Sequence, residues 1–209
     1  MARKQLFVVA AEVAAELNRG VIVAKQLKLV ASNARALALR AGGSAAGFHP
    51  ITDSIDELVS LTLEVSNSIN TKAQHLSHIA TSSVRSHSVL RHFEAVYHRS
   101  QEARFIHSLD AARSRCQQET LRLDQSFSQG SDELSSMLNS LYDELRVALI
   151  ISTLLSVEAS QVEEQFKGQL NTIAQNVQQA AEAIREHVLQ SLQLFSLFDK
   201  ERHEIKSAI

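Results

Sequence analysis

Four of the seven glycine and proline residues of this chain lie in one short segment. The 209 residues contain one proline and six glycines, and three of the glycines, Gly42, Gly43 and Gly47, lie just before Pro50. Sheets and loop-rich folds need turn residues about every ten positions, and most of this chain has none. The sequence therefore predicts an all-α protein of long helices, with its clearest reversal of direction at residues 40–50.

Before this segment, small and apolar residues recur at alternating steps of four and three from Leu6 to Ala41. This spacing is the heptad pattern of a helix that packs along a partner helix. The stripe changes from leucine and valine to alanine as it approaches Gly42, so a partner helix can come closest there. We predict a first helix that ends at the glycines, followed by a tight antiparallel hairpin.

The segment after the glycines has the features of a helix start. Pro50 has the fixed φ that suits a first helical turn, and Asp53 and Asp56 place negative charge near the positive end of the helix dipole. The heptad stripe then resumes from Ile51 to Tyr97, with polar interruptions at Lys72, Ser83 and Ser86. A second helix is expected here.

A second group of turn-forming residues predicts a turn near 128–131. It contains Ser128 and Gly130, and Ser131 stands before two acidic residues as an N-cap would. We therefore expect a hairpin region at 1–97 and a continuous helical extension at 98–209, with a last helix from 131 onward. If unbroken, the second helix would reach about 115 Å and the last about 105 Å, which describes a rod. Breaks near His98 or Gly168 would instead fold the ends back into a compact monomeric bundle.

Composition and charge argue against several kinds of partner. The chain has 21 basic and 23 acidic residues, so it has no surplus charge that would attract nucleic acid or an anionic membrane. Its longest strongly apolar run, Val147 to Leu155, is about half of the ~20 residues needed to cross a bilayer, so no membrane insertion is expected. The single cysteine, Cys116, excludes an internal disulfide and fits a reducing, cytoplasmic compartment.

Residues 23–59, VAKQLKLVASNARALALRAGGSAAGFHPITDSIDELV, resemble the hairpin tip of methyl-accepting chemotaxis receptors. The resemblance needs no gap, and its most specific part is N-A, then R-A-G, then G-F at fixed separations. The matching residues are Ala24, Gln26, Ala31, Asn33, Ala34, Ala38, Arg40, Ala41, Gly42, Gly47, Phe48 and Leu58.

The resemblance implies a long antiparallel helical hairpin whose tip binds the chemotaxis histidine kinase and its coupling protein. Carried over to this chain, the partner-binding residues of the tip are Asn33, Leu37, Arg40, Gly42, Gly43, Gly47, Phe48 and Ile51. Receptors of this family are parallel dimers of hairpins, with a four-helix cross-section. No cofactor is implied.

The chain also departs from the receptor pattern. Lys25 stands where the family has an aromatic residue that helps receptor dimers associate into trimers, and a charge is unfavourable in such a packed contact. Gly43 replaces the tip glutamate, Ser32 replaces a leucine and Leu37 replaces a glutamate. The departure at Lys25 argues against receptor-type trimers, and the other departures argue against kinase activation in the usual way.

We also expect a homodimer. The first helix is too short to cover the distal part of the second, so an isolated chain would expose a long apolar strip, which soluble monomers avoid. The residues of this strip include Phe105, Ile106, Leu109, Leu145, Ile150 and Leu155.

Two further groups of residues are candidates for chemistry. Glu163 and Glu164 match the first half of the family's methylation pattern, although adjacent acids on an exposed helix are commonly only solvated. His75 and His78 lie on one helix face at a spacing that can hold a metal, but no acid completes the site locally. Exposed helical histidines without a ligand are the simpler interpretation. Cys116 is expected to be a small buried hydrophobe.

Nothing in the sequence resembles a nucleophile elbow, a phosphate-binding glycine loop or a paired-carboxylate site, so an enzyme is not expected. The preferred hypothesis is a cytoplasmic chemotaxis-signalling protein with a receptor-like tip. The alternatives are a structural coiled-coil scaffold and a histidine-based sensor or phosphotransfer bundle.

Overall fold

The computed structural model describes residues 2–100, 102 and 104–207, and side-chain burial at 9, 11–43, 45–100, 102 and 104–196. It contains four long helices, α1 (Ala2–Ala41), α2 (Phe48–Arg99), α3 (Asp110–Gln161) and α4 (Glu164–Ser207). Two short 3-10 helices, η1 (Gly42–Ala45) and η2 (Ile106–Leu109), lie in the connections. The described ranges contain no strand, and the predicted all-α fold is confirmed.

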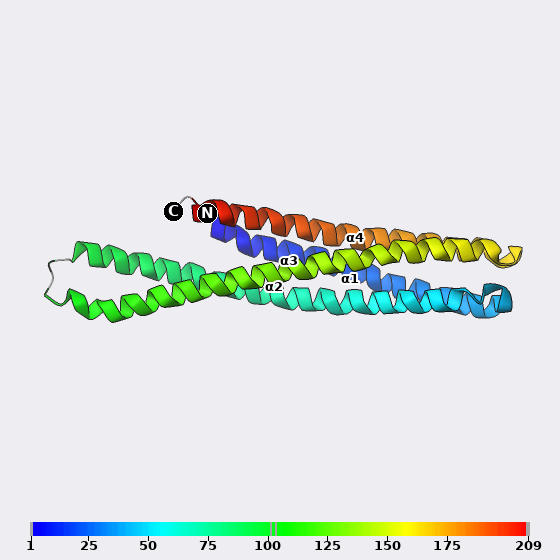
Figure 1. Cartoon of the computed structure of the whole chain (residues 1–209), viewed down its shortest axis with the longest axis horizontal. Helices are drawn as coiled ribbons and strands as arrows, with labels where there is room; N and C mark the ends of the chain where they lie inside the picture. The colour runs from blue at the N-terminus through cyan, green and yellow to red at the C-terminus, as the bar shows by residue number, and fades with distance from the viewer. Residues whose placement is uncertain (1, 101, 103, 208–209) are drawn as a thin grey trace.

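The helices form an antiparallel four-helix bundle with an extension at one end (Figure 1). Helix α1 packs along α2 and α4, and α3 packs along the same two helices, so α1 and α3 occupy diagonal corners. The α1–α2 and α3–α4 turns lie at one end of the molecule, and the α2–α3 connection lies at the other, beyond both chain termini. We call the part of α2 and α3 that continues without the other two helices, residues 86–99 and 110–120, the distal hairpin.

The core follows the heptad stripes. In α1 the predicted stripe is buried throughout the part whose burial is described, from Val13 and Leu17 to Ala38, with only Ala41 half-buried. The last two helices bury the leucine-rich face that the sequence predicts, for example Leu138, Leu155 and Leu170. In α2 the predicted stripe is buried only in part as far as Ser83, because Ile51, Val65, Lys72 and Ile79 are half-buried. Beyond Ser83 all of its residues are half-buried, because α1 no longer covers them.

The predicted turn near 128–131 is wrong, because α3 runs through it as one helix of 52 residues. Ser131 is only 1% exposed and lies in the helical seam, so it is not an N-cap. A Cβ atom built on Gly130 would lie 3.0 Å from Cδ1 of Leu76, so the glycine allows α2 and α3 to approach closely. Small residues here serve helix packing and do not end the helix.

The chain reverses instead at residues 100–109 and 162–163. Helix α2 ends where Ser100 leaves helical geometry, and its N–H donates to the carbonyls of Val96 and Tyr97 at 3.0 and 3.3 Å. Helix α3 ends at Val162, whose backbone is extended with φ −80° and ψ 157°. The uninterrupted rod is therefore wrong, and the alternative with breaks near His98 and Gly168 describes the fold.

The apolar strip that was expected to require a second chain is largely covered within this one. Leu145 and Leu155 are at most 1% exposed, because the folded-back helices cover them in the bundle, and Ile106 is 7% exposed at the end of the α2–α3 hairpin. Phe105 and Ile150 do remain exposed. In the described part of the chain, no helix combines the length and apolar character needed to span a bilayer.

Candidate functional site

The receptor-like motif lies at the end of the bundle that carries the α1–α2 and α3–α4 turns, which we call the turn end. Helix α1 stops because Gly42 adopts a φ of +67°, a left-handed conformation that glycine tolerates and other residues disfavour. The short helix η1 follows, with the Ala46 N–H donating to the carbonyl of Gly43 at 3.4 Å. Phe48 then starts α2. The predicted reversal at 40–50 is therefore found where the sequence places it.

The second turn packs against the first. Helix α3 contacts η1 near its own C-terminal end, and the Glu158 carboxylate lies against Gly47, where a Cβ atom would collide with it. Beyond Val162, the carbonyl of Glu163 accepts N–H bonds from Phe166 at 2.9 Å and Lys167 at 3.2 Å, which begins α4. The glycine of the G-F pair thus brings the two hairpins into close contact.

The predicted tip residues divide into an exposed set and a buried set. Asn33, Arg40, Gly42 and Gly43 are exposed, and Gly47 and Ile51 are half-buried. Two others lie inside the bundle: Leu37 is 9% exposed, and Phe48 is 0% exposed. As direct contacts for a partner these two predictions are wrong, because their side chains close the end of the hydrophobic core.

Opposite charges connect α1 and α2 just behind the first turn. Arg35 forms an ion pair with Asp53 and a second one with Asp56 at 3.2 Å. From the sequence, only an interaction with the helix dipole was predicted for these two acids. Their ion pairs with Arg35 depend on how closely α1 and α2 pack behind the turn, which the sequence pattern does not give. Arg40 is exposed in the last turn of α1. Among the described residues, its side chain makes no hydrogen bond to the backbone carbonyls at the C-terminal end of α1.

Glu163 and Glu164 are exposed at the second turn. Glu163 precedes α4 and accepts a hydrogen bond from the Gln165 amide at 2.8 Å, while Glu164 begins the helix and lies 3.5 Å from the Lys167 ammonium. They are not on the face of a continuous helix, which the methylation pattern assumes. Their modification stays a prediction.

The histidine and cysteine candidates lie far from the turn end. His75 and His78 are exposed on α2, and within the described residues no three His, Cys, Asp or Glu side chains form a group that could hold a metal ion. Cys116 is half-buried, with its Sγ 3.8 Å from the carbonyl oxygen of Ser86. It was expected to be a small buried hydrophobe, and it is buried only in part because the distal hairpin is formed by two helices alone.

A polar seam in and beside the distal hairpin was not predicted. Asp124 accepts hydrogen bonds from Ser83 at 2.7 Å and pairs with His87 at 2.9 Å. Farther out, Glu94 accepts two hydrogen bonds from Arg113, whose guanidinium also lies 4.6 Å from the Tyr97 ring centroid. The hydrogen bonds from Arg113 to Glu94 raise the pKa of this arginine. The polar interruptions at Ser83 and Ser86 were the available signal in the sequence.

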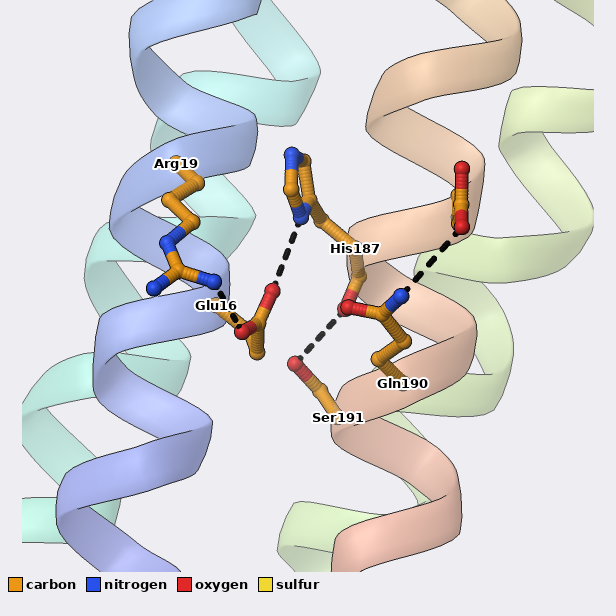
Figure 2. Close-up of polar contacts among 6 residues, drawn as sticks. Glu16, Arg19, His187, Gln190 and Ser191 are labelled. Carbon is orange, nitrogen blue, oxygen red and sulfur yellow. Dashed lines mark hydrogen bonds and ion pairs between the residues drawn. The ribbon is translucent and has the colours of Figure 1, made fainter.

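A second polar cluster joins α1 to α4 (Figure 2). The Glu16 carboxylate lies between Arg19, at 2.5 Å on the same helix, and Nδ1 of His187, at 2.8 Å from α4. The Ser191 hydroxyl donates to the carbonyl of His187 at 2.9 Å. A groove of about 470 Å³ beside the cluster is lined by Glu12, Ala15, Glu16, Arg19, Gln190, Gln193 and Leu194. The Glu16–His187 contact connects α1 to α4 beside their apolar seam.

Comparison of the chain with protein-family models, curated proteins and solved structures found no match. The likeness to chemotaxis receptors therefore depends on the motif at residues 23–59 and on the geometry around it.

Proposed function

We propose that this chain is a chemotaxis-signalling protein whose turn end binds the chemotaxis histidine kinase or its coupling protein. The observation that supports this most directly is the position of the first reversal. The chain turns at Gly42, within residues 40–50, where the receptor-like motif, aligned without a gap, puts its hairpin tip.

The arrangement of the two hairpins lends further support. In the receptor family, two chains each contribute a hairpin to a four-helix cross-section. Here the α1–α2 and α3–α4 hairpins lie side by side with their turns at the same end (Figure 1). We infer that one chain supplies the four-helix end that two receptor chains form together. The homodimer expected from the sequence is not needed for this purpose and stays a prediction.

The surface available to a partner is narrower than the motif suggests. Asn33, Arg40, Gly42 and Gly43 are exposed on the α1 side of the turn end, while Leu37 and Phe48 support it from inside. The proposed contact is therefore the exposed side of the last turn of α1 together with the glycines. With a single cysteine and no surplus charge, the chain suits the cytoplasm, where these partners act.

The experiment measures binding of the full chain to the purified kinase and coupling protein by biolayer interferometry. Arg40→Glu should weaken binding about tenfold or more if the guanidinium meets an acidic or polar partner surface. Arg99→Glu is the matched control, because it makes the same charge change on an exposed residue at the opposite end of α2. Phe48→Ala is unsuitable, since it removes a fully buried side chain and would disturb the turn itself.

Absence of binding to both partners would overturn the proposal, and so would equal losses in the two arginine variants. A structural scaffold is the first alternative, and exposed apolar residues such as Leu29 on α1 and Ile150 on α3, 68% and 61% exposed, favour it. A histidine-based sensor stays the second alternative: His87 and His187 each pair with a carboxylate, but the described residues contain no group of three His, Cys, Asp or Glu side chains that could hold a metal ion.

A further inference from the structure

Two helices carry an apolar stripe on the side that faces away from the core. On α1, Ile22, Leu29 and Leu39 are 51%, 68% and 64% exposed. On α3, the exposed stripe contains four residues at steps of three and four: Val147, Ile150, Leu154 and Val157. Both stripes have the heptad spacing of a helix that packs along another helix, and both are additional to the buried stripes of the same helices.

The other two helices differ at the same level of the bundle. The exposed face of α4 near the turn end is formed by polar residues: Gln165, Gln169, Thr172, Gln175, Asn176 and Gln179. On α2 the corresponding face has Leu61, 36% exposed, as its large exposed hydrophobic residue. The outward apolar stripes are therefore specific to α1 and α3 and are not a general property of the surface.

The two stripes carry opposite charge. From residue 17 to residue 41 the sequence contains no acidic residue, and Lys25 and Lys28 lie exposed within and beside the α1 stripe. The α3 stripe is preceded by the exposed acids Asp143 and Glu144, and Glu158 is half-buried near its end. Arg146 is the one basic residue of that stretch. An apolar stripe with basic flanks thus matches an apolar stripe with acidic flanks.

The register of the two stripes also agrees. Helices α1 and α3 both run toward the turn end, so they are parallel when two copies stand side by side with their turn ends level (Figure 1). Aligning the heptads places Lys25 beside Asp143, Leu29 beside Val147 and Leu39 beside Val157. The other apolar residues of the stripes, Ile22, Ile150 and Leu154, then lie beside Ser140, Ser32 and Ala36, and Lys28 lies beside Arg146. The same alignment brings the helix ends, Ala41 and Gln161, to nearly the same level.

We propose that a second copy of this chain docks here, with the α1 stripe of one copy against the α3 stripe of the other. The contact is heterologous, and α1 and α3 occupy diagonal corners of the bundle, so each copy can bind two others and association continues beyond the dimer. Lys25, which is unfavourable in an apolar contact by itself, is paired with Asp143 in this arrangement.

The contact is short. From Ile22 to Leu39 it extends for about 25 Å along the helix, and one helix pair of this length buries less than the ~800 Å² per partner that is usual in stable complexes. Association should therefore be weak and should depend strongly on protein concentration. It does not depend on the proposed kinase binding, and its test contains no other protein.

The test measures the mass of the full chain by light scattering and sedimentation velocity over a wide concentration range. The mass should rise from the 23.1 kDa of one chain past that of a dimer. Lys25→Glu and Asp143→Lys should each weaken association about fivefold or more, because each puts like charges in contact. The control is Glu64→Lys, a charge reversal on the exposed face of α2. Circular dichroism checks that the variants stay helical.

Combining the two charge-reversal variants tests whether Lys25 and Asp143 meet in the contact. An equimolar mixture of the two single variants should regain association, because each copy then offers its partner an opposite charge. The double variant, Lys25→Glu with Asp143→Lys, should regain it alone. A constant mass of 23.1 kDa at all concentrations would overturn the proposal. Association that stops at a dimer would also overturn it. The same holds if only one of the two charge reversals weakens association, or if neither the mixture nor the double variant restores it.

Discussion

At the scale of single residues, Gly42 and Gly43 are adjacent glycines with different roles. Gly42 has a φ of +67°, whereas Gly43 does not have a positive φ, and a Cβ atom on either would meet open space. Gly42→Ala should therefore lower the free energy of unfolding by about 1 kcal/mol, through backbone strain alone. Gly43→Ala, the matched control, should be neutral or slightly stabilising. Urea denaturation followed by circular dichroism measures both, and equal losses would contradict this account of the turn.

Glu119 gives a second residue-scale prediction. Hydrogen bonds from Arg122, one turn later on α3, lower the pKa of the Glu119 carboxyl below its ordinary 4.5. A carboxyl with a lowered folded-state pKa contributes stability above its unfolded-state pKa and loses it as the pH falls through the folded-state value. Arg122→Gln should return the pKa of Glu119 toward 4.5, as measured by an NMR titration. Arg146→Gln, on the same helix but distant, should leave it unchanged.

Residue type alone could not separate the roles of the glycines. Gly42 was correctly predicted to end a helix, because a fading alanine stripe precedes it and Pro50 follows it. Gly130 has serines and acids around it that resemble a turn and an N-cap, yet it lies within α3 and faces Leu76. The difference is set by α2, which packs against Gly130 from a distant part of the sequence. Phe48 was predicted to be a surface contact but is buried, because its burial also depends on helices that lie far from it in the sequence.

At the scale of helices, the distal hairpin is held differently from the bundle. Between residues 86 and 120, α2 and α3 pack on each other alone, and polar pairs such as Glu94 with Arg113 connect them. With less apolar burial, this part should open locally at lower free energy than the bundle. Amides at 86–99 and 110–120 should exchange with deuterium faster than those at 55–80 and 134–159, as measured by mass spectrometry. Similar exchange rates in both parts would contradict this.

A substitution tests the polar pair itself. Arg113→Leu removes both hydrogen bonds to Glu94 and the stacking on Tyr97, so the distal hairpin should become less stable, by a small amount because solvent screens the partly exposed pair. Exchange in the distal hairpin should become about three- to fivefold faster, while exchange in the bundle stays the same. Arg91→Ala, an exposed residue of the same hairpin, is the control.

The helices themselves could be predicted well, but their ends could not. The heptad stripes fixed which faces are buried, because burial at that period is a local property of the sequence. The reversals at 100–109 and 162–163 contain neither glycine nor proline. They exist because folding back buries Leu145, Leu155 and Leu170 in one shared core, and this gain involves residues that are far apart in the sequence. A scan for turn residues does not detect that kind of helix end.

At the scale of the whole molecule, chain reversal decides the length of the particle. Helices α2 and α3 have 52 residues each and span about 78 Å, and α1 and α4 lie alongside them, so a single chain should have a maximum dimension of about 80–90 Å. The uninterrupted second helix expected from the sequence would alone reach about 115 Å. Small-angle scattering distinguishes the two, provided that the sample is monomeric.

Lys25→Glu provides such a sample, because it should suppress association at scattering concentrations. With a mass of 23.1 kDa from the forward intensity, a maximum dimension near 85 Å is expected for the folded-back bundle with its distal hairpin. A dimension above about 110 Å at that mass would mean that α2 and α3 have separated into a longer rod. Because the bundle core includes Leu17, Leu138 and Leu170 from three different helices, such an opening would expose apolar surface that α1 alone cannot cover. The compact length is therefore expected to persist on dilution.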